Sequence, residues 1–363
     1  PIEVGGLAGG VLDLNQANVK GSLYNTQTTG QGYDPATDVG IGKTTAEMKM
    51  VETYTDITET SWDFENVWQM KEPDSGYQSY PYLRAFSYDD PGAVPKVNPI
   101  PGLGVFAYAG GSGTEADPYQ IETWEHLHNV RQNLDAHFVL NNDLDVTTEG
   151  YTTYVKDGET LANDGKGWKP IGNQDHPFTG TFDGKSNAID RMIISRFNTD
   201  YIGLFGSIAG GEVENVVLTN VQIIGADDVG GLVGRLDSGT ISTSFMTGAV
   251  TGLNDVGGLV GTHENGTITA SYATGDVEGE NDVGGLVGIH ENGTITVSYT
   301  TGEVDGDSQV GGLVGMATGG TISRSYAASK VSGTGSGLGG SIGSAANSPA
   351  VTTSFWNIES SRQ

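Results

Sequence analysis

Apolar and glycine positions recur with a constant spacing along the C-terminal half of the chain. The hexapeptide Val-Gly-Gly-Leu-Val-Gly begins at Val229, Val256, Val283 and Val310, so successive copies are 27 residues apart. A weaker copy begins at Leu338, 28 residues after the last of these. Self-similarity at one fixed period indicates a solenoid, in which each repeat packs only on its neighbours.

A second motif follows each hexapeptide. It reads Gly-Thr-Ile, then Ser or Thr, then a variable residue, then Ser and an aromatic residue. Because the isoleucine never varies, we expect it to point inward. The variable residue accepts Ala and Arg alike, so we expect it to face solvent. The isoleucines are Ile241, Ile268, Ile295 and Ile322, and the variable residues are Thr243, Ala270, Val297 and Arg324.

Each repeat thus offers three short β-like segments separated by glycines, which oppose a helix. Stacking one coil on the next by parallel hydrogen bonds places like residues about 4.8 Å apart. The sequence therefore predicts an all-β fold, a right-handed parallel β-solenoid with about 27 residues per coil. The alternative is a β-sandwich of short hairpins, but a sandwich does not need a constant period.

The rest of the chain predicts four regions. Residues 1–86 are predicted to be the C-terminal end of a preceding solenoid module, and residues 87–104, with four prolines, a Pro-rich linker. Residues 105–200 are predicted to be the cap region that begins the next module, and 201–363 its regular coils. A short helix over 122–134, with Trp124, Leu127, Val130 and Leu134 on one face, is expected to cover the open end of the solenoid.

The two ends of the chain resemble each other. Val4-Gly-Gly-Leu-Ala-Gly and the segment that follows it match Leu338-Gly-Gly-Ser-Ile-Gly and its sequel, with offsets of 332 to 334 residues. We therefore expect slightly more than one period of a larger repeat. The expected assembly is a covalent tandem array or a head-to-tail fibre, in which the partner is another copy of the chain.

Composition and charge exclude several classes of function. The 363 residues include 57 glycines and no cysteine, so disulfides, thiolate metal sites and cysteine nucleophiles are absent. The net charge is −28, from 17 Lys and Arg against 45 Asp and Glu. This balance excludes nucleic acid as a partner, since phosphate binding needs a basic face. We expect no membrane span, because no apolar run is long enough.

Three aspartates precede successive hexapeptides, at Asp228, Asp255 and Asp282. Stacking would place these carboxylates close together, where they repel one another. Such a ladder of oxygen ligands is a candidate Ca²⁺ site, and the alternative is a solvated acidic edge. The sequence requires no other cofactor.

Two further pairs lie at one predicted corner. His263 and His290 are candidates for catalysis or metal binding, but we expect a solvent-exposed turn there, because neighbouring repeats carry Leu236 and Ala317 at the same position. Asn265-Gly-Thr and Asn292-Gly-Thr are glycosylation sequons. Asn-Gly is also simply a good turn, so both interpretations stay open.

The aromatic residues of the second motif, Tyr272, Tyr299 and Tyr326, are expected to pack in the core, with sugar stacking as the alternative. A glycosidase would need acidic residues that converge on one groove. The acidic residues here follow the repeat period instead, as a structural role predicts.

These motifs resemble the GLUG-motif family. The repeated Gly-Gly-Leu-Val-Gly with its Gly-Thr-Ile partner carries the resemblance, together with Ala116-Asp-Pro-Tyr-Gln-Ile and Trp168-Lys-Pro-Ile-Gly. The resemblance implies a large secreted or cell-surface protein, of an adhesin-like kind. Such repeats also accompany zinc peptidase domains. His263-Glu264 and His290-Glu291 are each followed by Asn-Gly-Thr, so the His-Glu-x-x-His zinc motif is missing and the peptidase activity does not carry over.

The sequence thus predicts an extracellular structural or adhesive surface protein, not an enzyme. Its expected partners are copies of itself and cell-surface glycans. The alternative is a carbohydrate-binding or carbohydrate-cleaving β-helix protein.

Overall fold

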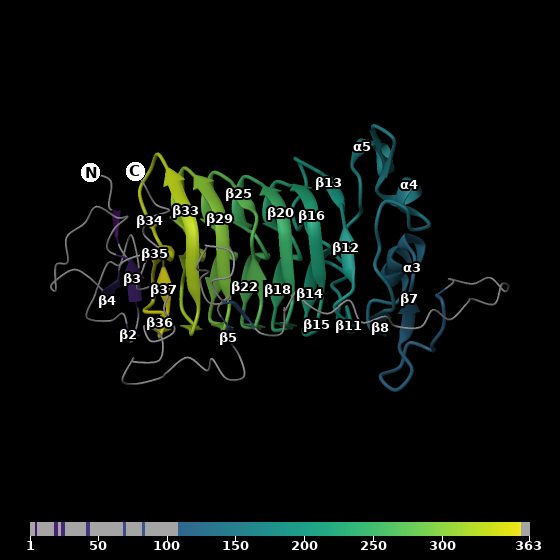
Figure 1. Ribbon diagram of the computed structural model, residues 1–363, viewed down its shortest axis with the longest axis horizontal. Helices are drawn as coiled ribbons and strands as arrows, with labels where there is room; N and C mark the ends of the chain where they lie inside the picture. Colours follow the sequence, from purple (N-terminus) through teal and green to yellow (C-terminus); the bar gives the residue numbers. More distant parts are fainter. Residues whose placement is uncertain are drawn as a thin grey trace, which may run out of the picture.

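The computed structural model describes residues 108–356 and, in the preceding part of the chain, the backbone of six short strands. The strands run in rows from one end of an elongated molecule to the other, and the helices lie at one end (Figure 1). Predictions that concern the linker at 87–104, and most of those for residues 1–86, lie outside the described residues.

Four parallel sheets form the sides of the column. Sheet 1 contains β17 (Asp227–Gly230), β21 (Asn254–Gly257), β26 (Asn281–Gly284), β30 (Ser308–Gly311) and β34 (Leu338–Gly339). Sheet 2 contains β14 (Phe205–Ala209), β18 (Val233–Asp237), β22 (Val260–Glu264), β27 (Val287–Glu291), β31 (Val314–Ala317) and β35 (Ile342–Ala345).

The other two sheets extend further toward the helices. Sheet 3 contains β7 (Tyr119–Ile121), β8 (His137–Leu140), β11 (Thr181–Asp183), β15 (Glu212–Glu214), β19 (Thr240–Ser242), β23 (Thr267–Thr269), β28 (Thr294–Thr296), β32 (Thr321–Ser323) and β36 (Ala350–Thr352). Sheet 4 contains β12 (Ala188–Asp190), β13 (Ile193–Ser195), β16 (Val217–Ile224), β20 (Phe245–Thr251), β24 (Tyr272–Ala273), β25 (Asp276–Glu278), β29 (Tyr299–Gly306), β33 (Tyr326–Gly333) and β37 (Phe355–Trp356).

The predicted parallel β-solenoid with about 27 residues per coil is confirmed. Ile268 pairs with Ile241 on one side and Ile295 on the other, and all three side chains are fully buried. The leucines of the hexapeptides form a second buried stripe. Each such side chain contributes about 1.5–3 kcal/mol on burial, so the continuous stripes hold the coils together.

Each coil has four sides, not the three segments that the sequence indicated. The hexapeptide is not one strand, because β17 ends at Gly230 and β18 begins at Val233. The intervening Gly231 lies at a corner where a Cβ atom would come within 2.6 Å of the Gly258 carbonyl oxygen. Glycine is therefore needed for the close approach of successive corners.

The variable residue of the second motif lies at a corner of the coil, where its backbone is left-handed. The expectation that it faces solvent holds for some coils only. Its φ angle lies between 47° and 53° in successive coils, and Val297 is only 9% exposed, although Arg324 is exposed as expected. The residues are Thr243, Ala270, Val297, Arg324 and Thr353.

A ladder of buried serines closes this corner. The Ser298 hydroxyl donates a 2.9 Å hydrogen bond to the Thr296 carbonyl oxygen and accepts one from the Ser271 N–H at 3.4 Å. The same pattern recurs in the neighbouring coils, so each hydroxyl satisfies two backbone groups that would otherwise be buried without partners. The serines are Ser244, Ser271, Ser298, Ser325 and Ser354.

Helices cover the end of the solenoid at β7, as predicted. The helix α3 (Trp124–Asn129) is capped by Thr123, whose hydroxyl accepts a 3.1 Å hydrogen bond from the His126 N–H. It continues only as the short 3-10 helix η2 (Val130–Gln132), so the predicted helix over 122–134 is shorter than expected. Beside them lie α4 (Tyr151–Tyr154), α5 (Ala162–Gly165) and the hairpin of β9 (Lys156–Asp157) and β10 (Thr160–Leu161).

Three N-terminal strands extend the other end of the column. They are β1 (Val4–Gly5), β2 (Asn18–Lys20) and β3 (Leu23–Asn25), and they pair in parallel with β34, β36 and β37 of the last coil. The segment of the chain that resembles the last coil in sequence therefore stacks directly on that coil. The backbone of β4 (Ile41–Lys43) pairs with β3, and β5 (Trp68–Gln69) pairs antiparallel with β6 (Tyr82–Leu83).

Candidate functional site

The three candidate calcium ligands form a vertical ladder beside the Gly-rich corner. Asp228, Asp255 and Asp282 occupy β17, β21 and β26, and all have left-handed backbones with φ of 53° to 56°. Asp228 is 9% exposed and its carboxylate accepts a hydrogen bond from the Thr262 hydroxyl. The sequence prediction that stacking brings these three residues together is therefore confirmed.

The causes that shift the pKa of the carboxyl group differ from one aspartate of this ladder to the next. Burial raises the pKa of Asp228, and the bond from Thr262 counteracts that effect. Burial, then the charges of Asp228 and Asp282, raises the pKa of Asp255 to about 7. Burial raises the pKa of Asp282 to about 6. Ile289 and Met316 occupy the position of Thr262 in the next two coils, so Asp255 and Asp282 lack the hydroxyl partner.

Beside this ladder, side-chain amides bridge the coils. Asn281 donates to Asn254, which in turn donates to Asp227, each across 2.8 Å between the amide nitrogen and the accepting oxygen. Within residues 108–356, no group of three or more His, Asp or Glu side chains is arranged to hold a metal ion. Calcium binding by the aspartate ladder stays a prediction.

The histidine pair is not at a solvent-exposed turn, so that prediction was wrong. Both rings are fully buried in the solenoid interior, and their Nδ1 atoms lie 3.0 Å apart. Burial lowers the pKa of His263 to about 4, and burial and the neighbouring His263 lower that of His290 to about 3. Leu236 and Ala317, which replace histidine in the adjacent coils, are buried as well. Their apolar character was the available signal for an inward position.

The sequon asparagines lie where the sequence predicted. Asn265 and Asn292 are exposed at one corner, with φ of 51° and 52°. A left-handed Asn in a tight turn fits both the simple turn and the glycosylated alternative, because neither side chain is enclosed. Glycosylation therefore stays a prediction.

The aromatic ladder is buried, as expected, but its rings are not part of the hydrophobic cluster inside the solenoid, to which the neighbouring Met246 and Ala273 belong. Tyr272 stacks on Phe245 and on Tyr299 with ring centroids 4.5 Å apart, and Tyr299 stacks on Tyr326 at 5.0 Å. The four rings are 2–8% exposed, so their faces are not presented to a sugar.

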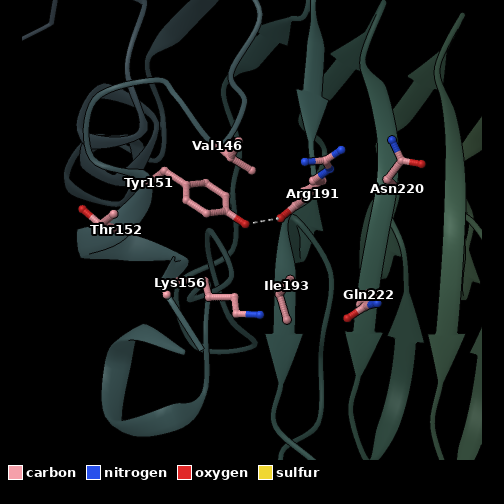
Figure 2. A pocket seen from close by; sticks show the side chains of 9 residues that line it. Val146, Tyr151, Thr152, Lys156, Arg191, Ile193, Asn220 and Gln222 are labelled. Atoms are coloured by element: carbon pink, nitrogen blue, oxygen red, sulfur yellow. Dashed lines mark hydrogen bonds between the residues drawn. The ribbon is translucent and has the colours of Figure 1, made fainter. Parts of the chain in front are cut away.

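A pocket of about 600 Å³ lies between the irregular segment after β8 and sheet 4 (Figure 2). The Tyr151 hydroxyl donates a 3.1 Å hydrogen bond to the Arg191 carbonyl oxygen across it. Arg191 is paired with Asp190 at 3.5 Å, and Lys156 with Glu159 at 3.8 Å. Its lining residues include no carboxylate or histidine, and hence no pair of acids for glycoside cleavage. The sequence showed only an irregular insertion here, with no motif to mark the pocket.

Comparison with known proteins identifies the repeat. Residues 252–278 match the family model described as the GLUG motif, which confirms the resemblance seen in the sequence. Halomucin of Haloquadratum walsbyi is 35% identical over 164 residues, which cover 44% of this chain and 2% of halomucin. A candidate Gly-rich membrane protein of Evansella cellulosilytica is 40% identical over 132 residues, which cover 36% of this chain and 14% of that protein. The chain thus spans only a small part of the length of these relatives.

Among solved structures, a candidate immunoglobulin A1 protease from Bacteroides ovatus is similar in fold. The TM-score is 0.52 at 22% identity, and the match covers 69% of this chain and 80% of the other. At this identity the likeness concerns the fold alone. No helix of the described residues is long and apolar enough to cross a membrane.

Proposed function

We propose that this protein is a structural, adhesive module of an extracellular cell-surface protein, and that copies of it join end to end. The joint would be made by the N-terminal strands of one copy stacking on the last coil of another. Within one chain, β1, β2 and β3 pair in register with β34, β36 and β37, and this register supports the proposal because the same pairing would form between two copies. The copies would be either covalent tandem modules or separate subunits of a fibre.

The two ends of the column suit this role because they differ. Helices and the strand β7 cover one end, which blocks edge-to-edge pairing there. At the other end, β1, β2 and β3 add to the last coil by parallel strand pairing. A head-to-tail contact of this kind is heterologous and continues indefinitely unless it closes.

The similar proteins support a surface location. One is named halomucin and another a Gly-rich membrane protein, and each is similar to part of this chain. The proposal assigns no catalysis to the module. Its solenoid would serve as a rigid spacer that presents surfaces to copies of itself and to glycans.

Disulfide trapping tests the end-to-end joint, because the chain has no cysteine of its own. Val19 and Val351 are direct neighbours across β2 and β36, so a Val19→Cys, Val351→Cys variant would place two thiols within bridging distance. After oxidation, we expect a ladder of covalent multimers on a denaturing gel and end-to-end particles in micrographs. The control pairs Val19→Cys with Val331→Cys, which lies on sheet 4 and should not cross-link.

If oxidation at every protein concentration yields only monomers with an intrachain disulfide, the N-terminal strands cap the last coil of their own chain. The fibre is then excluded for this chain. The enzymatic alternative is tested separately on a panel of polysaccharides, where turnover would favour a carbohydrate-cleaving β-helix over a scaffold.

A further inference from the structure

A second pocket, of about 560 Å³, lies where the capping helices meet the first coils. It is formed by the end of α3 with η2, by the loop at 168–176 and by the loop at 196–202. Three cationic side chains line it, together with two amides and an aromatic ring. They are Arg131, Lys169, Arg196, Gln132, Asn173 and Tyr201.

Both guanidinium groups are held by hydrogen bonds to carbonyl oxygens of the same loop. Arg131 Nε donates to the Pro170 carbonyl oxygen at 3.1 Å, and Arg196 Nε donates to the Trp168 carbonyl oxygen at 3.2 Å. The Arg131 guanidinium also lies 4.3 Å from the centre of the Trp168 ring, and its Nη1 donates to the His128 carbonyl oxygen at 2.7 Å. These contacts hold both groups rigidly before any ligand arrives.

Neither arginine is neutralised. Among the described residues, no carboxylate lies within ion-pair distance of Arg131, Arg196 or Lys169. The buried Nη2 of Arg131 has no hydrogen-bond partner. Burial, and then the neighbouring charge of Arg196, lowers the pKa of Arg131 to about 9, so its positive charge is held at a cost. In the pocket of Figure 2, by contrast, both cations are paired with acids.

Such a cluster is exceptional in this chain. The net charge is −28, and residues 197–323 carry 16 Asp and Glu against the single Arg235. The pocket lining includes one carboxylate, Asp200, which accepts a 3.3 Å hydrogen bond from the Asp227 N–H. The surface would repel a long polyanion, whereas the pocket provides a local positive field for a single anionic group.

We propose that this pocket binds the carboxylate of an acidic sugar, as a uronate residue of a surface glycan. Guanidinium groups recognise planar carboxylates through paired hydrogen bonds, and Arg196 and Lys169 line the pocket without a carboxylate partner among the described residues. The amides of Gln132 and Asn173 and the ring of Tyr201 suit the hydroxyls and the face of a sugar ring. The volume exceeds what an inorganic anion needs and lies within the range of small-ligand sites.

Calorimetric titration of the full chain with D-glucuronate tests the proposal, with D-glucose as the matched neutral sugar and acetate and sulfate as anions without a ring. We expect one site per chain for glucuronate, with glucose, acetate and sulfate each at least about tenfold weaker, since hydrogen bonds to a charged group are among the stronger ones. The variants Arg196→Gln and Lys169→Gln should each weaken glucuronate binding by about tenfold or more.

The matched control is Arg191→Gln, which removes the same charge from the other pocket and should leave the affinity unchanged. Lys169 is exposed, so its variant should fold, as an unchanged circular dichroism spectrum would show. Absence of glucuronate binding, equal affinity for glucose, or equal losses in all three variants would overturn the proposal. Acetate or sulfate binding as tightly as glucuronate would overturn the assignment to a sugar. None of these outcomes depends on whether copies join end to end.

Discussion

The burial of the histidine pair predicts how the free energy of unfolding depends on pH. Replacing both rings, in the variant His263→Leu, His290→Leu, should remove two groups that resist protonation inside the solenoid. Leu236 occupies the same inward position one coil earlier and is fully buried, so the shape of the interior accepts leucine there. His290 Nε2 has no hydrogen-bond partner, so the variant should be at least as stable as the wild type at pH 7.

The magnitude follows from the pKa values. In the folded protein the pKa is about 4 for His263 and about 3 for His290, whereas an unfolded histidine has a pKa of about 6.5. Below that value the unfolded chain binds the additional protons, so the free energy of unfolding falls as the pH falls toward the folded pKa values. The slope is about 1.4 kcal/mol per pH unit for each ring, or about 4 kcal/mol for the pair at pH 5.

The aspartate ladder acts in the opposite direction. The raised pKa values of Asp255, about 7, and Asp282, about 6, mean that the folded state takes up these protons first and gains stability as the pH falls. Both carboxyls are partly exposed, so solvent screening makes their effect smaller than these values suggest. The difference between wild type and variant isolates the histidine contribution.

Urea unfolding followed by far-UV circular dichroism at pH 7, 6 and 5 measures that difference. We expect the variant to gain about 4 kcal/mol relative to the wild type between pH 7 and pH 5, with an unchanged denaturant slope. If the two proteins lose or gain stability in parallel over this interval, the rings are protonated in the folded state and the reasoning fails.

Three further predictions concern single positions. Thr243→Asn should raise the free energy of unfolding by about 1 kcal/mol, because a β-branched residue is strained at φ 47°, and an unchanged urea midpoint would contradict this. Ser298→Ala should lower it by about 2 kcal/mol or more in the same assay, since the Thr296 carbonyl and the Ser271 N–H lose their partner; a loss below about 0.5 kcal/mol would show that neither needs the hydroxyl. Millimolar Ca²⁺ should raise the thermal midpoint of the wild type but not of Asp255→Asn, and identical midpoints with and without Ca²⁺ would remove the calcium prediction.

The stacking of the coils was predictable because the period is constant. Ile268 and Ile295 occupy equivalent places in consecutive repeats, so a parallel ladder was the arrangement that used every copy in the same way. The same comparison placed Asp228, Asp255 and Asp282 in one column. The four-sided coil was harder to predict, because the Gly-Gly pair of the hexapeptide allows either a strand or a corner, and only the packing of successive corners decides between them.

The buried histidines and the two pockets were not predicted, for different reasons. The polarity of His263 suggested an exposed turn, although its neighbours in the column, Leu236 and Ala317, are apolar and indicated an inward position. The pockets lie where the cap region meets the first coils, and most of their residues come from segments that precede the regular repeats and offer no repeat to align. Arg131 and Arg196 are 65 positions apart in the sequence, and only the fold brings them together.

The identical register of every coil also makes the column a ruler. Each coil offers its successor the same pattern of donors, acceptors and apolar stripes that it receives from its predecessor. A gene that gained or lost one 27-codon unit would therefore lengthen or shorten the molecule by about 4.8 Å without creating a new kind of contact. The length of the molecule could thus be adjusted in small steps over evolutionary time. The helical cap at one end and the last coil at the other, on which β1, β2 and β3 stack, would stay as they are.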